Sequence, residues 1–278
     1  PLVNTDDMPF IPKSVLKSNR YHKHSFPLSL GRPLRWGYIL ANRGCRFWCR
    51  FCTGMTRQSL NKTYRLCSPE RLVEEMIYQI REGNRTIISI EDDLFSGNRD
   101  WTLEVCDLLE KVDWNHPWII QTRFDQLDEE LAIRLKKTGC VGMTIGVESG
   151  SDKVLNNLNK KETVAQIKVI GKILTRLGFR NRYTVMIGSL GETREDFEKT
   201  VELLKELNPL IAQMTYCTPY PDTSIALDSD NESRFMRFEF PARNLSEIPD
   251  DELPRMRVSF YRRFYLSGKY LRTYASNW

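Results

Sequence analysis

Three cysteines lie close together in segment 44–52, and no other group of residues in this chain comes nearer to naming a chemistry. Cys45, Cys49 and Cys52 follow a C-x3-C-x2-C pattern. Thiolates are soft ligands that select iron–sulfur clusters or zinc. Because a cubane 4Fe–4S cluster has four irons, three cysteines leave one iron without a protein ligand. Such an iron is open to direct binding of a substrate or cofactor.

Zinc is the competing interpretation of the same cysteines. A structural zinc site takes four ligands, commonly two cysteine pairs or a mixture of Cys and His. The nearest further cysteine, Cys67, lies beyond a fourteen-residue gap, and no His lies between Cys45 and Cys67. A disulfide framework fails on parity, because the chain has seven cysteines and four of them are scattered singly. The spacing favours the open cluster and leaves zinc as the alternative.

The composition is that of an ordinary globular protein. The chain has 278 residues, of which 41% are hydrophobic and 28% charged, enough for one large α/β domain or two small ones. No apolar run approaches the length of a membrane span, and no secretory signal opens the chain. Together with unpaired cysteines, this predicts a cytoplasmic protein. Because the chain begins with Pro1, upstream domains are left open.

The net charge of +5 is distributed unevenly. From Met8 to Pro69 the chain contains twelve Lys and Arg and neither Asp nor Glu, and four of the arginines surround the cysteines. A solvated basic face is the plain explanation, and attraction of an anionic cluster, cofactor or substrate is the functional one. The charge is short of a strongly basic domain, so we do not expect nucleic-acid binding.

Strands and helices alternate from residue 35 onward. A helix is predicted at about 69–82, with Ser68 as N-cap and Gly83 closing it. Further helices are expected through Leu103, Val105 and Leu109, in an Asp128-capped segment to 137, at 151–158 and 163–177, and after Thr193 as N-cap. Consecutive βα units indicate a parallel sheet, either a doubly wound open sheet or a full or partial βα barrel. The predicted strands are 35–41, 86–90, 118–123, 141–147, 183–187 and 211–217.

Polar residues follow the predicted strands at the points where they end. In both candidate architectures, ligands bind at the carboxyl ends of the parallel strands. We therefore expect these residues to form one active-site rim. The set is Cys45, Glu91, Asp92, Asp93, Gln121, Arg123, Glu148, Ser149, Gly188 and Tyr216.

The chain changes character after the sixth strand. Residues 228–254 are charged and interrupted by prolines, which predicts a loop. From about residue 250 an amphipathic helix is expected, with Phe260, Tyr261, Phe264 and Tyr265 among interleaved arginines. We expect this helix to pack back on the domain, and a partner-binding or membrane-surface face is the alternative.

The motifs at the strand ends resemble those of the radical S-adenosylmethionine (SAM) superfamily from residue 42 almost to the end of the chain. The resemblance is to the branch often fused to cobalamin-binding domains. Arg46, Leu190 and Asp222 replace a frequent proline, a proline and a glycine of the family motifs. These departures weaken the assignment to this branch, but they remove no cluster ligand. The resembling segments are the cysteine loop, 91–95, 146–150, 186–193 and 219–223, with 7–12 similar to the linker after a cobalamin domain.

This resemblance implies an α/β fold, a partial (βα)6 barrel of radical SAM type with a helical C-terminal extension. Residues 1–34 form a linker, 35–227 the barrel and 228–278 the extension. Cys45, Cys49 and Cys52 hold a 4Fe–4S cluster, and the amino and carboxylate groups of SAM chelate the fourth iron. One electron from the cluster cleaves SAM, and the resulting 5′-deoxyadenosyl radical takes a hydrogen atom from a substrate.

Around the adenine and the carboxylate of SAM, the resemblance implies three contacts. Phe51 packs near the adenine, Gly188 lets the backbone approach the same ring, and Arg123 faces the carboxylate. Each has a plainer explanation: a loop-anchoring core aromatic, a tight turn and an ion pair with an acid.

Four acidic or hydroxyl residues are implied for the rest of the cofactor. Asp92 or Asp93 accepts a hydrogen bond from the SAM ammonium, with a helix-capping turn as the alternative. Glu148 and Ser149 meet the ribose or the methionine moiety, with a buried strand-end hydrogen bond as the alternative. Cys217 is expected to be a buried cysteine rather than a substrate contact.

Two functions follow from these patterns. The first is a radical SAM enzyme acting on an unknown substrate, a cobalamin-associated methyltransferase or a cyclase, supplied with electrons by a reductant such as flavodoxin or ferredoxin. Cobalamin enters only through a domain that is not in this chain. The second is a nonenzymatic zinc or iron–sulfur module that binds nucleic acid through the basic N-terminal third. No catalytic residue beyond the cofactor ligands is singled out.

Overall fold

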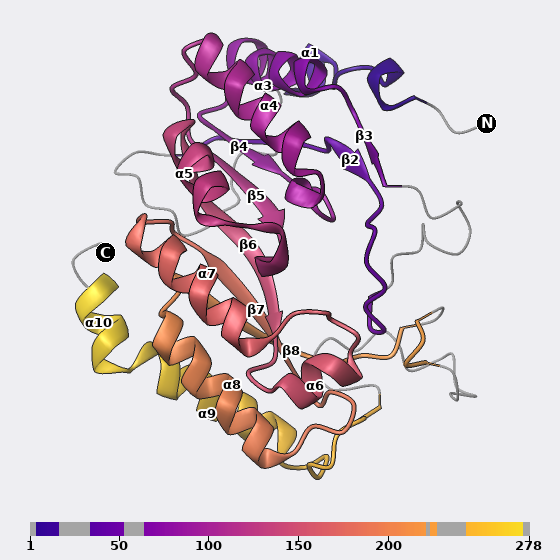
Figure 1. Cartoon of the computed structure of the whole chain (residues 1–278), viewed down its shortest axis with the longest axis vertical. Coiled ribbons are helices and arrows are strands. Elements are labelled where there is room, and N and C mark those ends of the chain that lie inside the picture. The colour runs from indigo at the N-terminus through magenta and orange to yellow at the C-terminus, as the bar shows by residue number, and fades with distance from the viewer. Residues whose placement is uncertain (1–3, 17–33, 53–63, 221–222, 227–242, 275–278) are drawn as a thin grey trace.

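A sheet of six parallel strands forms the centre of the computed structural model, which describes residues 4–16, 34–52, 64–220, 223–226 and 243–274 (Figure 1). The strands lie in the sheet in the order in which they follow along the chain. This confirms the predicted parallel sheet and excludes a doubly wound one, in which the strand order reverses. The strands are β1 (Trp36–Ile39), β4 (Ile87–Ile90), β5 (Trp118–Thr122), β6 (Cys140–Glu148), β7 (Arg182–Ile187) and β8 (Ile211–Tyr216).

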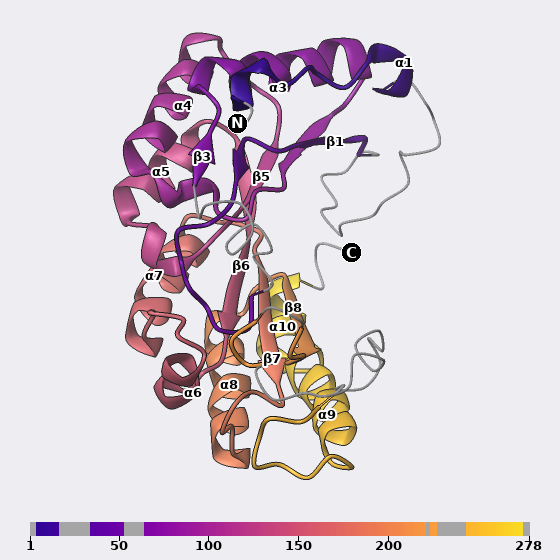
Figure 2. The same ribbon diagram turned by 90° about the vertical axis from the view of Figure 1, so that its right-hand side faces the viewer.

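The helices of the βα units cover one face of this sheet, as Figure 2 shows. The main apolar core lies between the two layers, and a smaller cluster of Trp36, Ile87, Ile119 and Leu210 lies on the other face. In the described part of the chain β1 and β8 do not pair, so the barrel is partial. None of the described helices has the length and apolar character to cross a membrane. The covering helices are α3 (Pro69–Gly83), α4 (Arg99–Lys111), α5 (Glu129–Lys137), α6 (Asp152–Asn157), α7 (Val164–Arg176) and α8 (Arg194–Leu207).

Helix boundaries follow local capping chemistry. The side chains of Ser68, Asp128 and Thr193 accept hydrogen bonds from backbone N–H groups in the first turns of α3, α5 and α8, which confirms the three predicted N-caps. α3 ends at Gly83, the residue that was predicted to close it. Gly83 is helical, and Asn84 adopts the left-handed conformation with φ 52°. Asparagine tolerates this conformation, and here its Oδ1 accepts a hydrogen bond from Arg35 at 2.8 Å.

Two short strands of the structure were not predicted from the sequence. The two-residue strands β2 (Asn42–Arg43) and β3 (Arg65–Leu66) form an antiparallel pair just before the cysteine loop and just before α3. Two residues carry no periodicity, so the pattern could not reveal them. In the N-terminal segment, the described part forms η1 (Thr5–Asp7) and α1 (Lys13–Leu16). Residues 228–242 of the predicted loop lie outside the described residues.

The open edge of β8 is covered by α9 (Leu253–Tyr265) and α10 (Gly268–Tyr274). The hydroxyl of Tyr265 accepts from the N–H of Ala212 at 3.1 Å and donates to its carbonyl at 3.0 Å. Tyr261 does the same at Met214, at 3.0 and 3.1 Å. Four residues of helix rise about 6 Å and two residues of strand about 6.6 Å, so the phenols match the strand repeat. The C-terminal helix therefore packs back on the domain, as predicted, and supplies hydrogen-bond partners for backbone groups of the edge strand.

Replacing both Tyr261 and Tyr265 with phenylalanine is expected to lower the free energy of unfolding by about 2–4 kcal/mol. Each change removes one hydroxyl that serves a backbone donor and a backbone acceptor in a half-buried place. Urea unfolding followed by circular dichroism measures the loss. The control is Tyr78→Phe, whose hydroxyl donates to the exposed carbonyl of Ile11 at 3.2 Å and whose loss is expected below about 0.5 kcal/mol. Equal losses in control and double variant would contradict the edge-covering role.

Candidate active site

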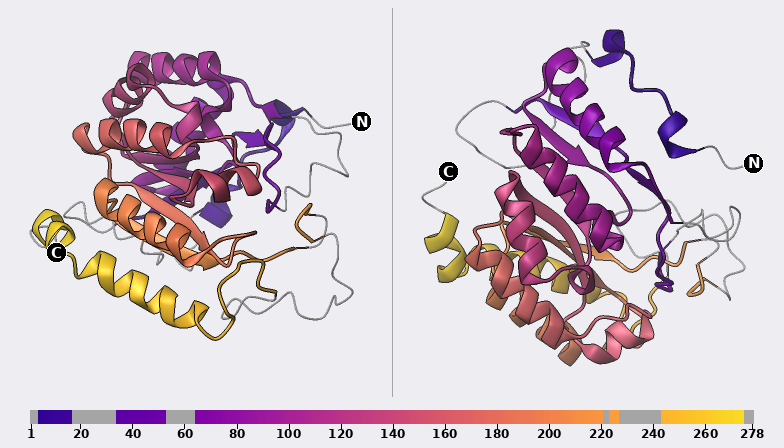
Figure 3. Two further views of the ribbon diagram at one scale, coloured as in Figure 1. Left: turned by 60° about the horizontal axis from the view of Figure 1, so that its bottom comes forward. Right: turned by 45° about the horizontal axis from the view of Figure 1, so that its top comes forward.

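The cysteine loop crosses the carboxyl ends of the strands. It leaves β1 and β2 and is anchored at its far end beside α6, a path visible from two sides in Figure 3. The N–H of Arg50 donates to the carbonyl of Leu158 at 2.9 Å, and the side-chain amide of Asn159 donates to the carbonyl of Trp48 at 2.7 Å. The sheet order places β4 and β5 between β1, from which the loop starts, and β6, which leads into α6. The loop therefore lies over the edge at which parallel strands gather their ligand-binding residues.

The three cysteines differ in exposure. Cys45 is half-buried, Cys49 is buried and Cys52 is exposed, and none of the cysteines of the chain forms a disulfide. Burial raises the pKa of the Cys49 thiol. The described residues contain no group of three or more His, Cys, Asp or Glu placed to hold a metal ion, so the thiols do not converge on one point here. Their assignment as cluster ligands stays a prediction.

The chemistry of the donor set fits an open cluster better than zinc. Three thiols belong to one short loop, and they are soft ligands. Cys67, the fourth ligand that the zinc interpretation requires, is buried in the main apolar core between sheet and helices. Burial raises its pKa to about 12.

Arg123, directly after β5, is buried against the cysteine loop. Its guanidinium lies over the ring of Phe47, with Cζ 3.9 Å from the ring centroid. Nη1 donates to Sγ of Cys49 at 3.3 Å. Nε and Nη2 donate to the two carboxylate oxygens of Asp125 at 2.9 and 2.8 Å. The predicted alternative of an ion pair with an acid is therefore present, and the same side chain also contacts a predicted cluster ligand.

A buried network of charges continues from Arg123. Nζ of Lys160 lies 3.2 Å from Oε1 of Glu148 and 3.4 Å from Oε2 of Glu162. The same Oε2 lies 3.8 Å from Nη2 of Arg123. Lys160, Glu148 and Glu162 are 4%, 7% and 2% exposed, so each charge depends on its partners for compensation. Removing one partner would leave an uncompensated buried charge.

Glu148 is held in an unusual conformation at the end of β6. Its φ is +64°, and the pairing of β6 with β7 is irregular between Gly146 and Glu148. A side chain at position 146 would place a Cβ 2.1 Å from Oε1 of Glu148. Gly146 thus leaves the space in which the carboxylate folds back toward Lys160. Left-handed backbone in residues other than glycine costs free energy and concentrates at functional sites.

Asp92 is buried beside the start of the loop. Its Oδ1 accepts hydrogen bonds from the N–H groups of Ala41 and Asn42 at 2.7 and 2.9 Å. Its Oδ2 has no hydrogen-bond partner among the described residues. Burial raises the pKa of Asp92 to about 7. A cationic donor placed at Oδ2 would remove this penalty, and Asp92 therefore suits an ammonium ligand, whereas Asp93 is exposed.

The ends of β7 and β8 form the apolar side of the site. Phe51 packs against a cluster made of Val154, Leu158, Met186, Cys217 and Ile225. Cys217 is fully buried, as expected.

The turn after β7 is stabilised by a side chain of its own segment, Glu192. Gly188 has φ +80°, and Oε2 of Glu192 accepts the N–H groups of Gly188 and Ser189 at 2.7 and 3.1 Å. Ser149 lies in the turn after β6, where its Oγ accepts the N–H of Ser151 at 3.2 Å and lies 3.3 Å from Oγ1 of Thr200. This is the buried strand-end hydrogen bonding that was the plainer alternative for Ser149.

The family model of the radical SAM superfamily matches residues 39–204, which is more than half of the chain. The chain belongs to the radical SAM superfamily. A radical SAM domain implies a 4Fe–4S cluster and SAM, and the site described above lies within or next to the matched residues.

Relatives of this radical SAM chain include methyltransferases and cyclases. An uncharacterized methyltransferase of Pyrococcus horikoshii is 26% identical over 98% of this chain and 59% of its own length. The anaerobic magnesium-protoporphyrin IX monomethyl ester cyclase of Rubrivivax gelatinosus is 26% identical over 82% of this chain and 42% of its own. The chain thus spans only about half of the curated relatives it matches.

Solved structures show the same fold. The radical SAM methyltransferase TsrM of Kitasatospora setae, with cobalamin and a [4Fe-4S] cluster bound, aligns with a TM-score of 0.60. The alignment covers 66% of this chain and 34% of that one at 17% identity. At this identity the likeness concerns the fold alone, and it confirms the predicted partial barrel.

Several residues of the radical SAM site were missed by sequence analysis. Glu192 lies inside a motif that resembled the family, but nothing marked it as the residue that holds the turn. The network residues carry no local signal, because burial and pairing depend on elements far apart in the chain. The missed residues are Phe47, Asp125, Lys160, Glu162 and Glu192.

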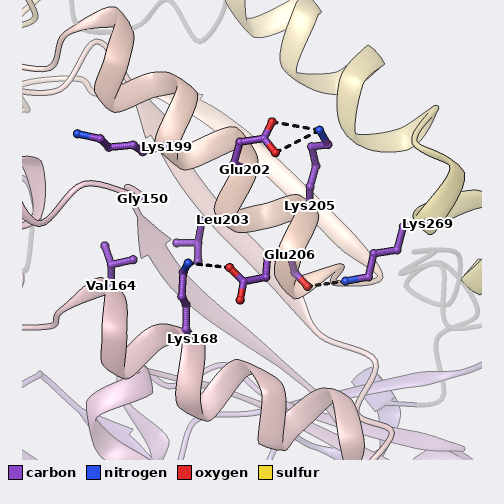
Figure 4. A pocket seen from close by; sticks show the side chains of 9 residues that line it. All are labelled: Gly150, Val164, Lys168, Lys199, Glu202, Leu203, Lys205, Glu206 and Lys269. Carbon is purple, nitrogen blue, oxygen red and sulfur yellow. Dashed lines mark hydrogen bonds and ion pairs between the residues drawn. The ribbon is translucent and has the colours of Figure 1, made fainter.

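Cavities in the described part of the chain lie on different sides of the radical SAM domain. The pocket of Figure 4, of about 520 Å³, opens among α7, α8 and α10 on the helical side and is lined by lysines and glutamates. Lys168 and Lys205 pair there with Glu206 and Glu202 at 2.7 and 3.0 Å. This pocket lies between helices, whereas the candidate site lies at the carboxyl ends of the strands. A second cavity, of about 430 Å³, lies between the N-terminal segment and β1 and reaches Glu91 at the rim.

Proposed function

We propose that this chain is the core of an enzyme that cleaves SAM reductively and starts radical chemistry on a substrate. The observation that carries the proposal is the cysteine loop anchored across the strand ends, beside a buried carboxylate with an unpartnered oxygen. Cluster and SAM supply the radical chemistry when bound, and the protein positions and shields them.

Individual residues divide the binding of the cofactors. Cys45, Cys49 and Cys52 hold the cluster. Oδ2 of Asp92 accepts a hydrogen bond from the SAM ammonium, and the compensation of its buried charge strengthens this contact.

The remaining contacts of SAM lie along the ends of β6 and β7. Phe51 and the backbone at Gly188 flank the adenine on the apolar side of the site. Glu148 faces the ribose or methionine moiety from a backbone conformation that fixes its carboxylate. Ser149 acts by fixing the turn that follows it, and Asp93 supplies negative charge at the exposed rim.

The reaction class is proposed from the relatives. Methyl transfer and cyclisation are the activities named for them, and cobalamin would act through a domain outside this chain. A flavodoxin or ferredoxin in the cytoplasm supplies the electron. Residues 1–34, 35–227 and 228–278 are proposed as linker, barrel and extension, although the boundary at 227 lies outside the described residues.

Anaerobic reconstitution with iron and sulfide tests this function. We expect a reduced cluster whose electron paramagnetic resonance (EPR) spectrum changes on addition of SAM, and formation of 5′-deoxyadenosine under dithionite. A spectrum that does not respond to SAM, with no deoxyadenosine formed, would contradict the proposal. Zinc at about one ion per chain, together with nucleic-acid binding, would support the nonenzymatic module instead.

A further inference from the structure

We infer that Arg123 acts on the cluster rather than on the SAM carboxylate: it donates to the sulfur of Cys49, fixes the cysteine loop and raises the reduction potential. This inference rests on the proposed function, since it requires that Cys49 be a cluster ligand. It makes Arg123 a positioning residue, because it acts through the ligand and the loop.

The hydrogen bonds of the guanidinium leave no edge open for a carboxylate. A guanidinium binds a carboxylate through two parallel N–H groups along one edge. The edge formed by Nε and Nη2 is occupied by Asp125. On the other edge, Nη1 donates to Cys49 and Nη2 donates to the carbonyl of Lys160. One face of the plane is covered by Phe47.

These contacts also connect the loop to the barrel. Phe47 and Cys49 belong to the loop, whereas Asp125 and Lys160 belong to the segments after β5 and α6. Arg123 joins both sides while being only 6% exposed. A short loop that must place three thiolates around a cluster needs such a fixed contact, because small displacements of ligand sulfurs weaken metal binding.

The charge of Arg123 bears on the cluster's potential. Reduction adds an electron, so a buried cation and an N–H donor at a ligand sulfur stabilise the reduced state more than the oxidised state. Without Arg123, the nearby carboxylates of Asp125 and Glu162 would lose a compensating charge and would further disfavour the added electron. Both effects of removing Arg123 lower the potential.

The test compares R123Q and R123K with the wild-type chain after anaerobic reconstitution. The midpoint potential is measured by EPR-monitored titration without SAM, and SAM affinity is measured separately. For R123Q we expect the equilibrium constant for reduction to fall at least tenfold, which is about 59 mV for one electron. SAM affinity should stay within about threefold. R123K keeps a cation but loses the forked N–H groups of the guanidinium, so its midpoint potential should fall less than that of R123Q.

The matched control is R46Q. Arg46 belongs to the same loop and carries the same charge, but it is exposed and contacts Gln126. Because water screens exposed charges, we expect its reduction equilibrium to change less than about threefold.

The two measurements separate the outcomes. An unchanged potential with SAM affinity reduced tenfold or more would overturn the inference and return Arg123 to the SAM carboxylate. If R123Q does not assemble a cluster, R123K decides: unchanged SAM affinity with a lowered potential supports the inference, and weakened affinity at wild-type potential overturns it. A wild-type cluster that ignores SAM refutes the proposed function and, with it, the premise of this inference.

Discussion

Cys49→Ser is expected to abolish cluster assembly and to reduce 5′-deoxyadenosine formation at least ~100-fold. A serine hydroxyl is a hard ligand that stays protonated, and two remaining thiolates do not hold a cubane. Iron and sulfide content, visible absorbance and EPR intensity measure the loss. Cys45→Ser and Cys52→Ser should behave alike, although these two side chains are more exposed than Cys49.

Cys67→Ala is the matched control for this loss. Cys67 is the remaining candidate for a fourth zinc ligand, but it lies in the apolar core. We expect full iron and sulfide content and a loss of about 1 kcal/mol in the free energy of unfolding from the small cavity. Loss of bound metal in Cys67→Ala to the same extent as in Cys49→Ser would indicate a four-cysteine zinc site.

Asp92→Asn is expected to weaken SAM binding at least tenfold and to make the stability of the cofactor-free chain less sensitive to pH. Burial raises the pKa of Asp92 to about 7, whereas an unfolded aspartate titrates near 3.9. Between these values the unfolded chain has released a proton that the folded chain keeps. The free energy of unfolding therefore falls as pH rises from about 4 to about 7, and it is level above that.

Asparagine removes this dependence while its Oδ1 still accepts the N–H groups of Ala41 and Asn42. The free energy of unfolding of the variant minus that of the wild type should therefore increase by about 2–3 kcal/mol from pH 5 to pH 8, at about 1.36 kcal/mol per pKa unit. Urea unfolding at both pH values and calorimetric titration with SAM provide the two measurements.

Asp93→Asn serves as the control, because Asp93 is adjacent and exposed. Its stability should change by less than about 0.5 kcal/mol at either pH, and its SAM affinity by less than about threefold. A stability difference between Asp92→Asn and wild type that is the same at pH 5 and pH 8 would contradict the buried-carboxylate account. Weak SAM binding in Asp93→Asn alone would transfer the ammonium contact to Asp93.

Much of the fold could be predicted because its signals are local. An N-cap such as Ser68 bonds to a backbone group three residues away, and strand periodicity is read within a few residues. The parallel sheet then followed from the regular alternation of strands and helices. α3 ends at Gly83, as predicted, but the left-handed residue that follows is Asn84, whose Oδ1 accepts a hydrogen bond from the distant Arg35.

Within the candidate site, the sequence could name side chains but could not choose among their partners. Asp92 and Asp93 are neighbours of the same type, and only the path of β1 and the cysteine loop buries one and exposes the other. For Ser149 the structure shows the buried hydrogen bonding in a turn beside Thr200, and a contact with SAM stays a prediction. The role of Lys160 depends on the tertiary structure, because the segment after α6 must pack against β5 and β6 before Lys160 meets its partners.

The amino-acid sequence by itself determined the order of the βα units, the position of the cysteine loop after the first strand and the resemblance to the radical SAM superfamily. Tertiary structure alone decided that Arg123 contacts Cys49, 74 residues away in the chain, and that Tyr261 and Tyr265 complete the edge of β8. The physical reason is the separation along the chain over which each interaction acts. Capping and periodicity arise between near neighbours, whereas burial, charge compensation and edge pairing depend on segments that meet only in the folded chain.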